Sequence, residues 1–305
     1  MTDFKELIEK LNHLATEQIN PASVDIDQRS PLEIARMIND EDHKIAAIVK
    51  SLLEPISQAA EIFATTLKNG GRVFYIGAGT SGRLGVLDAA ECPPTFGTDP
   101  EQIVGVISGG YDTLILSQEG VEDQVEEAIV DLKNRKVTAN DFVIGIAASS
   151  RTPYTLSGLR YAKELGCKNC FITCNKVERS AFDFDLDLLI TLEVGAEIIT
   201  GSTRMKSGTA QKLTLNMIST TAMVLLGKTY GNLMVDLQAR SDKLTARSRK
   251  ILIDLFAIEF EEADRLLKDA AGSVKLAIVM KQKGCSKVEA EALLKAADGF
   301  ISKIK

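Results

Sequence analysis

The sequence predicts an α/β fold in which helices cover both faces of a five-stranded parallel sheet. Short apolar runs, rich in β-branched and aliphatic residues, alternate with longer segments whose apolar residues recur at helical spacing. Runs of this kind are typical of strands buried on both faces, and their alternation with helices indicates parallel pairing. A ligand is then expected at the carboxyl ends of the strands, near a switch in strand order. The five predicted strands are residues 72–77, 103–108, 142–147, 169–173 and 187–192.

Residues 1–55 are predicted to form a mostly helical N-terminal segment with a loop in its middle. Ser30 is the expected N-cap of the second helical stretch, and Pro31 takes the first helical position, where its missing N–H is not needed. Glu33 follows Ser30 by three residues and completes a capping box. This segment therefore precedes the sheet domain, which is expected to span residues 56–240.

The first predicted strand runs into glycines and hydroxyls and then into a helical pattern, reading Arg-Val-Phe-Tyr-Ile-Gly-Ala-Gly-Thr-Ser-Gly-Arg over residues 72–83. Glycines let the backbone turn tightly and approach a ligand closely. Gly79, Thr80 and Ser81 would then offer N–H groups and hydroxyls at the positive end of a helix. The pattern is typical of a phosphate-binding loop.

Two nucleotide-binding alternatives fit this loop less well. A Walker A loop places lysine after the last glycine, whereas Arg83 stands there, which disfavours ATP or GTP hydrolysis. The glycine spacing does match the dinucleotide fingerprint, which calls for an acidic residue about 20 positions further on. Asp99 is near that distance, but it follows the Pro93-Pro94 turn and lies outside the expected end of the second strand. A nicotinamide site is therefore an open but poorly supported alternative.

Two carboxylates, Glu91 and Glu122, are candidates for proton transfer. The chain has 2 histidines, which removes most Ser/His/Asp and Cys/His triads and leaves acid/base chemistry to carboxylates. Glu91 stands just before Cys92-Pro93-Pro94, where the helix is expected to end. From residue chemistry alone Glu91 is more simply a solvated acid at a helix end, and Glu122 more simply part of a solvated helix face. Spacing does not decide between these interpretations and catalysis.

A second hydroxyl cluster follows the third predicted strand. Ser149, Ser150 and Thr152 precede Pro153, which takes a helix-start position. These residues either cap their own helix or bind the oxygens of a phosphate through O–H and N–H donors. Because two such loops on one sheet suggest one shared ligand, we favour the ligand. Neutral hydroxyls suit a reversibly held phosphosugar better than a nucleotide that requires metal.

A third polar loop, residues 194–212, leads into an apolar helix expected at residues 213–226. Glu197, Arg204 and Lys206 either line the substrate cleft or join a subunit contact. An exposed loop with a well-capped helix explains the pattern equally well.

The last segment, residues 245–305, is predicted to be a small helical domain. It is rich in Lys, Ala, Leu and Glu at helical spacing, and Ser286 is the expected N-cap of an amphipathic helix after a turn at Gly284.

Composition narrows the class of protein further. A net charge of -6 and the absence of a basic run argue against nucleic acid as partner. No stretch resembles a membrane span or a signal peptide, so a cytoplasmic location is expected. The 5 cysteines fit reduced thiols. The spacing Cys167-x-x-Cys170-x-x-x-Cys174 lacks a fourth zinc ligand nearby, so buried core thiols are favoured over a metal site.

Four motifs together resemble the N-acetylmuramic acid 6-phosphate etherase family, and the similarity runs essentially from end to end. The resemblance implies a flavodoxin-like, doubly wound sugar isomerase domain, related in architecture to the glucokinase regulatory protein. The motifs are Gly-Ala-Gly-Thr-Ser-Gly-Arg-Leu-Gly from residue 77, Glu-Cys-Pro-Pro-Thr from residue 91, Ala-Ala-Ser-Ser-Arg-Thr-Pro-Tyr from residue 147 and Val-Gly-Ala-Glu-Ile-Ile-Thr-Gly-Ser-Thr-Arg-Met-Lys-Ser-Gly-Thr from residue 194.

The resemblance also implies an activity. Members cleave the lactyl ether of their substrate to give N-acetylglucosamine 6-phosphate and D-lactate, in cell-wall sugar recycling, without a metal or organic cofactor. The family's two acid/base glutamates fall on Glu91 and Glu122, and a homodimer with sites near the subunit interface is implied. One position departs from the pattern: sugar isomerase domains often have glycine where Ser150 stands, so Ser150 either restricts this turn or adds a phosphate donor.

Two other functions stay open at this point. A phosphosugar-binding regulator would keep the hydroxyl loops but would not need the two glutamates. A phosphosugar isomerase would share the proton abstraction but not the ether cleavage.

Overall fold

A computed structural model describes residues 4–237 and 242–305. The chain divides into two compact units, one made of Met1–Ala90 and Glu101–Ser219 and the other of Glu91–Pro100 and Thr220–Lys305. The predicted division into three segments stays a prediction, and its boundary at residue 240 lies outside the described residues.

The first unit contains a five-stranded parallel sheet with the strand order β2-β1-β3-β4-β5. This is the flavodoxin-like order of doubly wound folds, with the switch in strand order between β1 and β3. The predicted fold class is therefore confirmed, and each predicted strand is present within one residue at either end. The strands are β1 (Val73–Gly77), β2 (Ile103–Ile107), β3 (Phe142–Ala147), β4 (Lys168–Thr173) and β5 (Leu188–Thr191).

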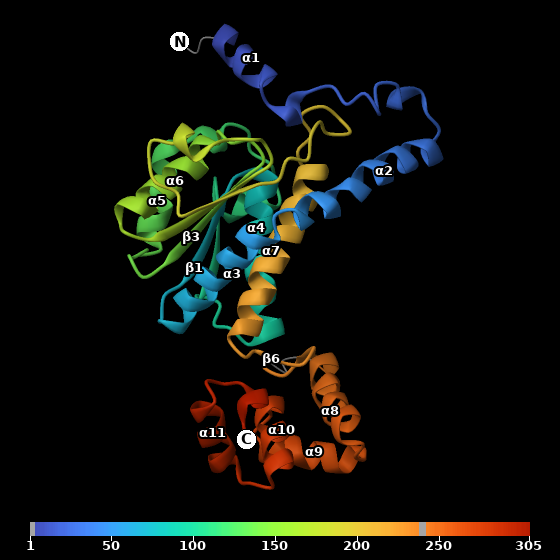
Figure 1. The fold of residues 1–305 in the computed structure, drawn as a ribbon, viewed down its shortest axis with the longest axis vertical. Helices are drawn as coiled ribbons and strands as arrows, with labels where there is room; N and C mark the ends of the chain where they lie inside the picture. Colours follow the sequence, from blue (N-terminus) through green and yellow to red (C-terminus); the bar gives the residue numbers. More distant parts are fainter. Residues whose placement is uncertain (1–3, 238–241) are drawn as a thin grey trace. The chain divides into compact units, whose positions relative to one another are not determined.

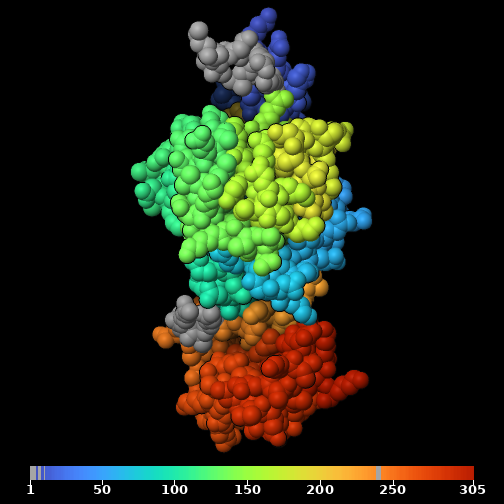
Figure 2. Space-filling view, turned by 90° about the vertical axis from the view of Figure 1, so that its left-hand side faces the viewer, coloured from blue at the N-terminus to red at the C-terminus, as the bar shows by residue number. Residues whose placement is uncertain are grey.

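Helices cover both faces of this sheet (Figure 1). One face carries α5 and α6, which form the outer layer seen in green in Figure 2. The other face carries α3, which packs on β1, β3 and β5, together with α4 and α7. The helices of this part of the chain are α1 (Phe4–Asn12), α2 (Pro31–Lys50), α3 (Leu53–Lys68), α4 (Gly79–Phe96), α5 (Val125–Asn134), α6 (Pro153–Glu164) and α7 (Lys206–Leu225).

The strands are continuous apolar runs because both of their faces are buried. Every residue of β1, β2 and β3 is buried, and Phe74 and Phe171 pack with Tyr154 under α5 and α6. Cys170 and Cys174 are fully buried, as predicted for core thiols, and burial raises the pKa of each to about 12. These thiols therefore stay neutral and unreactive at ordinary pH.

Local signals at helix ends are confirmed at two places. The Ser30 hydroxyl accepts a hydrogen bond from the Glu33 N–H, and the Glu33 carboxylate accepts one from the Ser30 N–H, which is the predicted capping box of α2. The predicted end of α4 before Pro93 is wrong, because the helix continues to Phe96 with both prolines inside it. Proline's fixed φ is helical, so two prolines in a last turn forgo hydrogen bonds without breaking the helix.

In its described residues, the regular structure of the second unit is helical apart from one small hairpin. The hairpin pairs two strands of two residues each, β6 (Thr229–Tyr230) and β7 (Leu233–Met234). Ser286 is the N-cap of its last α-helix, as predicted, and Glu289 completes a capping box. Among the described residues, no helix is both long and apolar enough to cross a membrane. The helices are α8 (Asp242–Phe256), α9 (Phe260–Asp269), α10 (Val274–Lys283) and α11 (Lys287–Ala296).

Candidate active site

The two hydroxyl loops leave neighbouring strands at the switch point of the sheet. Gly77 at the end of β1 is paired with Ile146 in β3, so the loops that follow these strands begin side by side. Crevices at the carboxyl ends of such strands are where doubly wound folds bind ligands. We refer to Gly79, Thr80, Ser81, Ser149, Ser150 and Thr152 as the cradle.

The first loop takes its shape from glycine. Gly79 has a φ of 53°, a left-handed conformation that disfavours any residue with a Cβ. A Cβ on Gly82 would lie 2.6 Å from the carbonyl oxygen of Gly77, so the chain turns too tightly for a side chain there. The helix α4 begins at Gly79, so its first N–H groups belong to this loop, and Thr80 is half-buried there.

The second loop does not use its hydroxyls to cap α6. Thr152 is the N-cap residue of α6, yet its side chain makes no capping hydrogen bond. The Ser149 and Thr152 hydroxyls lie 3.3 Å from each other, and Ser150 is 8% exposed. Helix capping alone therefore does not account for this hydroxyl cluster, and the first N–H groups of α6 are left for another acceptor.

Gln211, the sixth residue of α7, joins the two loops. The buried Ser81 hydroxyl donates to Oε1 of Gln211 at 2.9 Å, and the Gln211 amide reaches Sγ of Cys174 at 3.7 Å. The Cys174 N–H in turn donates to the carbonyl of Ala148 in the second loop at 3.0 Å. A set of contacts thus connects α4 and α7 to the second loop, which precedes α6, and an anion is the ligand that helix N-termini favour.

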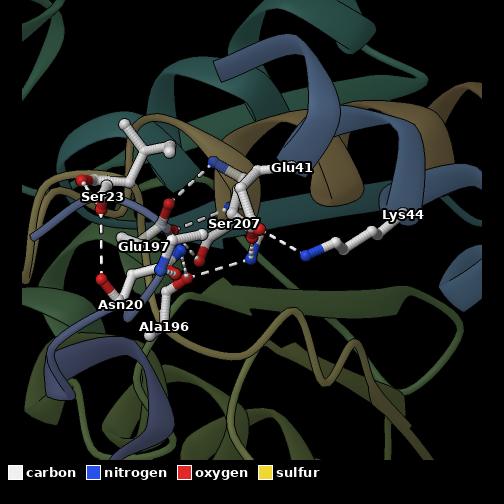
Figure 3. A network of polar contacts seen from close by, with 10 residues as sticks. Asn20, Ser23, Glu41, Lys44, Ala196, Glu197 and Ser207 are labelled. Atoms are coloured by element: carbon white, nitrogen blue, oxygen red, sulfur yellow. Dashed lines mark hydrogen bonds and ion pairs between the residues drawn. The ribbon is translucent and has the colours of Figure 1, made fainter. Parts of the chain in front are cut away.

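The N-terminus of α7 already holds an anion of the protein itself, Glu197 (Figure 3). The fully buried Glu197 carboxylate accepts hydrogen bonds from the N–H groups of Lys206 and Ser207 at 2.9 and 3.0 Å, and from the Ser207 hydroxyl at 2.6 Å. The helix therefore begins at Lys206 and not at the predicted Leu213. A carboxylate nine residues before the helix caps it, which the local N-cap rules cannot predict.

A buried ion pair lies beside this cap and connects α2 to α7. Lys206 Nζ lies 2.6 Å from Oε2 of Glu41, and it also donates to the carbonyl of Ala196 at 3.0 Å. Although desolvation opposes ionisation, hydrogen bonds from Lys206 and Lys44 hold the pKa of Glu41 down at about 2.

The side chains of Lys206 and Glu197 are thus already hydrogen-bonded to other groups of the protein. Of the three residues predicted to line a cleft or a subunit contact, Arg204 is exposed in this structure. Contact of Glu197 or Lys206 with a substrate would require the exchange of buried hydrogen bonds.

Sequence reasoning missed Glu41, although a signal for it exists. Glu41 stands four residues before Ile45 and eight before Val49, and these three form the buried stripe of α2. A carboxylate in register with an apolar stripe indicates a buried partner of opposite charge.

Glu122 lies beside the second loop. It belongs to the short turn Val121–Asp123, which packs against α6. The turn is half-buried, and the Glu122 carboxylate makes no hydrogen bond to another described residue. Glu122 is thus on a short, partly buried turn beside α6 and not on a solvated helix face.

Glu91 lies further along α4 than the cradle residues of that helix. It lies on α4 twelve residues beyond Gly79, which corresponds to about 18 Å along the helix axis. Its side chain is exposed and makes no hydrogen bond within the described part of the chain.

Asp88 is a second carboxylate on α4 that the sequence did not indicate. It accepts hydrogen bonds from the Tyr75 hydroxyl at 2.7 Å and the Ser219 hydroxyl at 3.0 Å. Burial raises the pKa of Asp88 to about 6, because these neutral hydroxyls and the nearby charge of Lys212 only partly offset desolvation. Among the described residues there is no group of three or more His, Cys, Asp or Glu side chains able to hold a metal ion.

Comparison with known proteins identifies the family of this chain. Residues 55–163 match the model of the glucokinase regulatory protein N-terminal SIS domain. The chain is 48% identical over 302 residues to an N-acetylmuramic acid 6-phosphate etherase of Salinibacter ruber, across 99% of this chain and 96% of the relative. It is also 48% identical over 293 residues to the enzyme of the same name in Clostridium beijerinckii, across 96% of each chain.

Proposed function

Because this chain belongs to the N-acetylmuramic acid 6-phosphate etherase family, we propose that it cleaves the D-lactyl ether of N-acetylmuramic acid 6-phosphate with water. The products are N-acetylglucosamine 6-phosphate and D-lactate, which makes the protein a carbon–oxygen lyase of cell-wall sugar recycling. The observation that carries the proposal is the pair of hydroxyl loops at the β1/β3 switch point, whose N–H and O–H donors suit a sugar phosphate.

The cradle holds the phosphate through neutral donors. Charge-assisted hydrogen bonds from N–H and O–H groups bind an anion strongly, and the positive ends of α4 and α6 add to this attraction. No cation from the protein is needed for this binding, so the phosphate product leaves readily. The reacting part of the sugar then extends from the cradle toward the acid/base groups.

The chemistry is an elimination followed by hydration. The opened sugar carries an aldehyde at C1, which makes the C2 proton acidic enough for a carboxylate to remove. Lactate leaves from C3 as its oxygen is protonated, and water then adds to the resulting double bond. Glu91 is the principal acid/base residue and Glu122 supports it. Each such proton transfer is typically worth about 10²–10⁴-fold in rate.

The length of α4 supports a site shared between two copies of the chain. Since Glu91 is about 18 Å from the start of its helix, the sugar held by one cradle reacts with Glu91 of a partner subunit. Glu122, next to α6, acts on the sugar in its own subunit. A homodimer with two equivalent sites follows from this arrangement. Substrate contact by Arg204, Glu197 or Lys206 and a cytoplasmic location both stay predictions.

The reaction is tested by incubating the purified protein with N-acetylmuramic acid 6-phosphate in H₂¹⁸O. Lactate release with the label in the sugar product is the expected result. Binding without turnover would instead indicate a regulator, and an isomerised sugar without lactate would indicate an isomerase. Glu91→Gln and Glu122→Gln are expected to lower kcat about 10²–10⁴-fold and to retain binding.

The shared site is tested by mixing two defective variants. Glu91→Gln is combined with Ser149→Ala/Thr152→Val, after unfolding and refolding together, and assayed below the KM of the cradle variant. If each site takes Glu91 from the partner, heterodimers contain one intact site, and roughly a quarter of the wild-type activity returns. No recovery in verified heterodimers would mean that both groups act within one subunit.

A further inference from the structure

Arg83 is the fifth residue of α4, close to the helix end at which a cation would be expected to bind the phosphate, but it binds protein carbonyls instead. Its Nε donates to the carbonyl of Leu114 at 3.2 Å, and one terminal nitrogen donates to the carbonyl of Thr113. The same nitrogen lies 3.5 Å from the Ser117 hydroxyl. All three acceptors belong to the long segment between β2 and α5.

This segment is tied further to the turn that carries Glu122. Thr113 is buried, and its hydroxyl contacts the carbonyls of Gly110 at 2.7 Å and Ser108 at 3.0 Å. The buried Ser108 hydroxyl donates to the carbonyl of Val121 at 2.5 Å. A continuous set of hydrogen bonds therefore runs from Arg83 to the residue directly before Glu122.

The other side of the turn is attached to α6. The Ser157 hydroxyl donates to the carbonyl of Val125 at 2.8 Å, three residues after Glu122. The turn is thus anchored to both helices that begin in the cradle, through Arg83 on α4 and Ser157 on α6. The Glu122 carboxylate itself is left without a hydrogen bond to the described residues.

We propose that Arg83 is a positioning residue that fixes Glu122 relative to the cradle, and not a ligand of the phosphate. The inference rests on the proposed function, since it assumes that Glu122 takes part in the reaction. The planar guanidinium presents several donors in a rigid fork and reaches two adjacent carbonyls at once, which a lysine ammonium on a flexible stem cannot do in the same geometry. Misplacing a reacting group by about 1 Å costs about 10²-fold in rate.

The decisive experiment is a double-mutant cycle of Arg83→Gln and Glu122→Gln. Arg83→Gln alone is expected to lower kcat about 10–100-fold with little change in KM. In the Glu122→Gln background it should cause no further loss, because the group that it positions is already gone. Arg83→Lys should recover part of kcat, and Ser108→Ala should lower kcat in the same way.

Several outcomes would overturn the inference. If Arg83 bound the phosphate, Arg83→Gln would raise KM and the inhibition constant of inorganic phosphate and would do so equally in both backgrounds. If Glu122→Gln kept the wild-type kcat, the premise itself would fail, which identifies the proposed role of Glu122 as the error. The matched control is Arg160→Gln. Arg160 lies on α6 and forms an exposed ion pair with Asp183, so its replacement should leave kcat unchanged.

A measurement that does not depend on activity distinguishes a local loss of positioning from a general loss of folding. Amide hydrogen exchange in Arg83→Gln should speed up across residues 109–124 and stay at the wild-type rate in the strands. Unchanged exchange in residues 109–124 would contradict a positioning role, whereas faster exchange throughout the first unit would mean that Arg83 stabilises the fold in general.

Discussion

The N-termini of α6 and α7 lie at the same edge of the sheet and are satisfied in different ways. At α7 a buried carboxylate of the protein, Glu197, accepts the first N–H groups of the helix. At α6 the N-cap residue Thr152 makes no side-chain capping bond, and hydroxyls surround the open end. The difference teaches where a ligand belongs: an end filled by an internal anion supports the fold, and an end left open is available to bind.

Replacing Glu197, the carboxylate that caps α7, is expected to have the largest effect, and this effect is on stability. Glu197→Ala leaves three donors without their acceptor in a buried place, so the free energy of unfolding should fall by about 3–5 kcal/mol. Urea unfolding monitored by circular dichroism measures it. Glu193→Ala, an exposed glutamate of the same loop, is the control and should change stability by less than about 0.5 kcal/mol. Equal stability of the two variants would contradict a structural role for Glu197.

Removing hydroxyls at the open end should affect binding and not stability. Ser149→Ala and Thr152→Val are each expected to raise KM about 10–100-fold, because each removes a hydrogen bond to a charged phosphate. Thermal stability without ligand should stay at the wild-type value. The matched control is Ser273→Ala, whose hydroxyl does cap its helix by accepting from the Leu276 N–H; it should lose about 1 kcal/mol of stability at unchanged KM. If Thr152→Val instead lost stability at unchanged KM, the Thr152 side chain would be a helix cap and not a phosphate ligand.

The pH dependence of stability extends the comparison to two carboxylates, buried Glu41 beside lysines and half-buried Asp88 beside hydroxyls. Lysines keep Glu41 ionised, whereas Asp88 faces hydroxyls and burial raises its pKa from 3.8 to about 6. Between these values the folded state binds more protons than the unfolded state, so the contribution of Asp88 to stability is full below pH 3.8 and is lost as pH rises through about 6. Asp88→Asn should therefore flatten the fall in unfolding free energy over this window in urea titrations, and an unchanged slope would refute it.

Much of the fold could be predicted from the sequence because its signals are local. Each strand of the sheet is a short apolar run that needs only its own residues to be recognised, and the caps at Ser30 and Ser286 depend on a residue three positions away. The two hydroxyl loops could also be placed at one edge, since all strands of a parallel sheet have their carboxyl ends at the same edge.

Other features depend on contacts between distant residues. The Glu197 cap, the Glu41–Lys206 ion pair and the Arg83 anchor join residues that are 9, 165 and 30 positions apart. Sequence spacing could not distinguish a charged residue that faces a ligand from one that binds the protein, because both carry the same side chain.

The sequence by itself determined the parallel sheet, the hydroxyl loops and the neutral chemistry of the cradle, since each depends on residue type and short-range periodicity. Only the tertiary structure decided which helix ends stay open and that Lys206 and Glu197 are buried. The physical reason is that burial and charge pairing arise from the packing of distant segments, which local spacing does not encode.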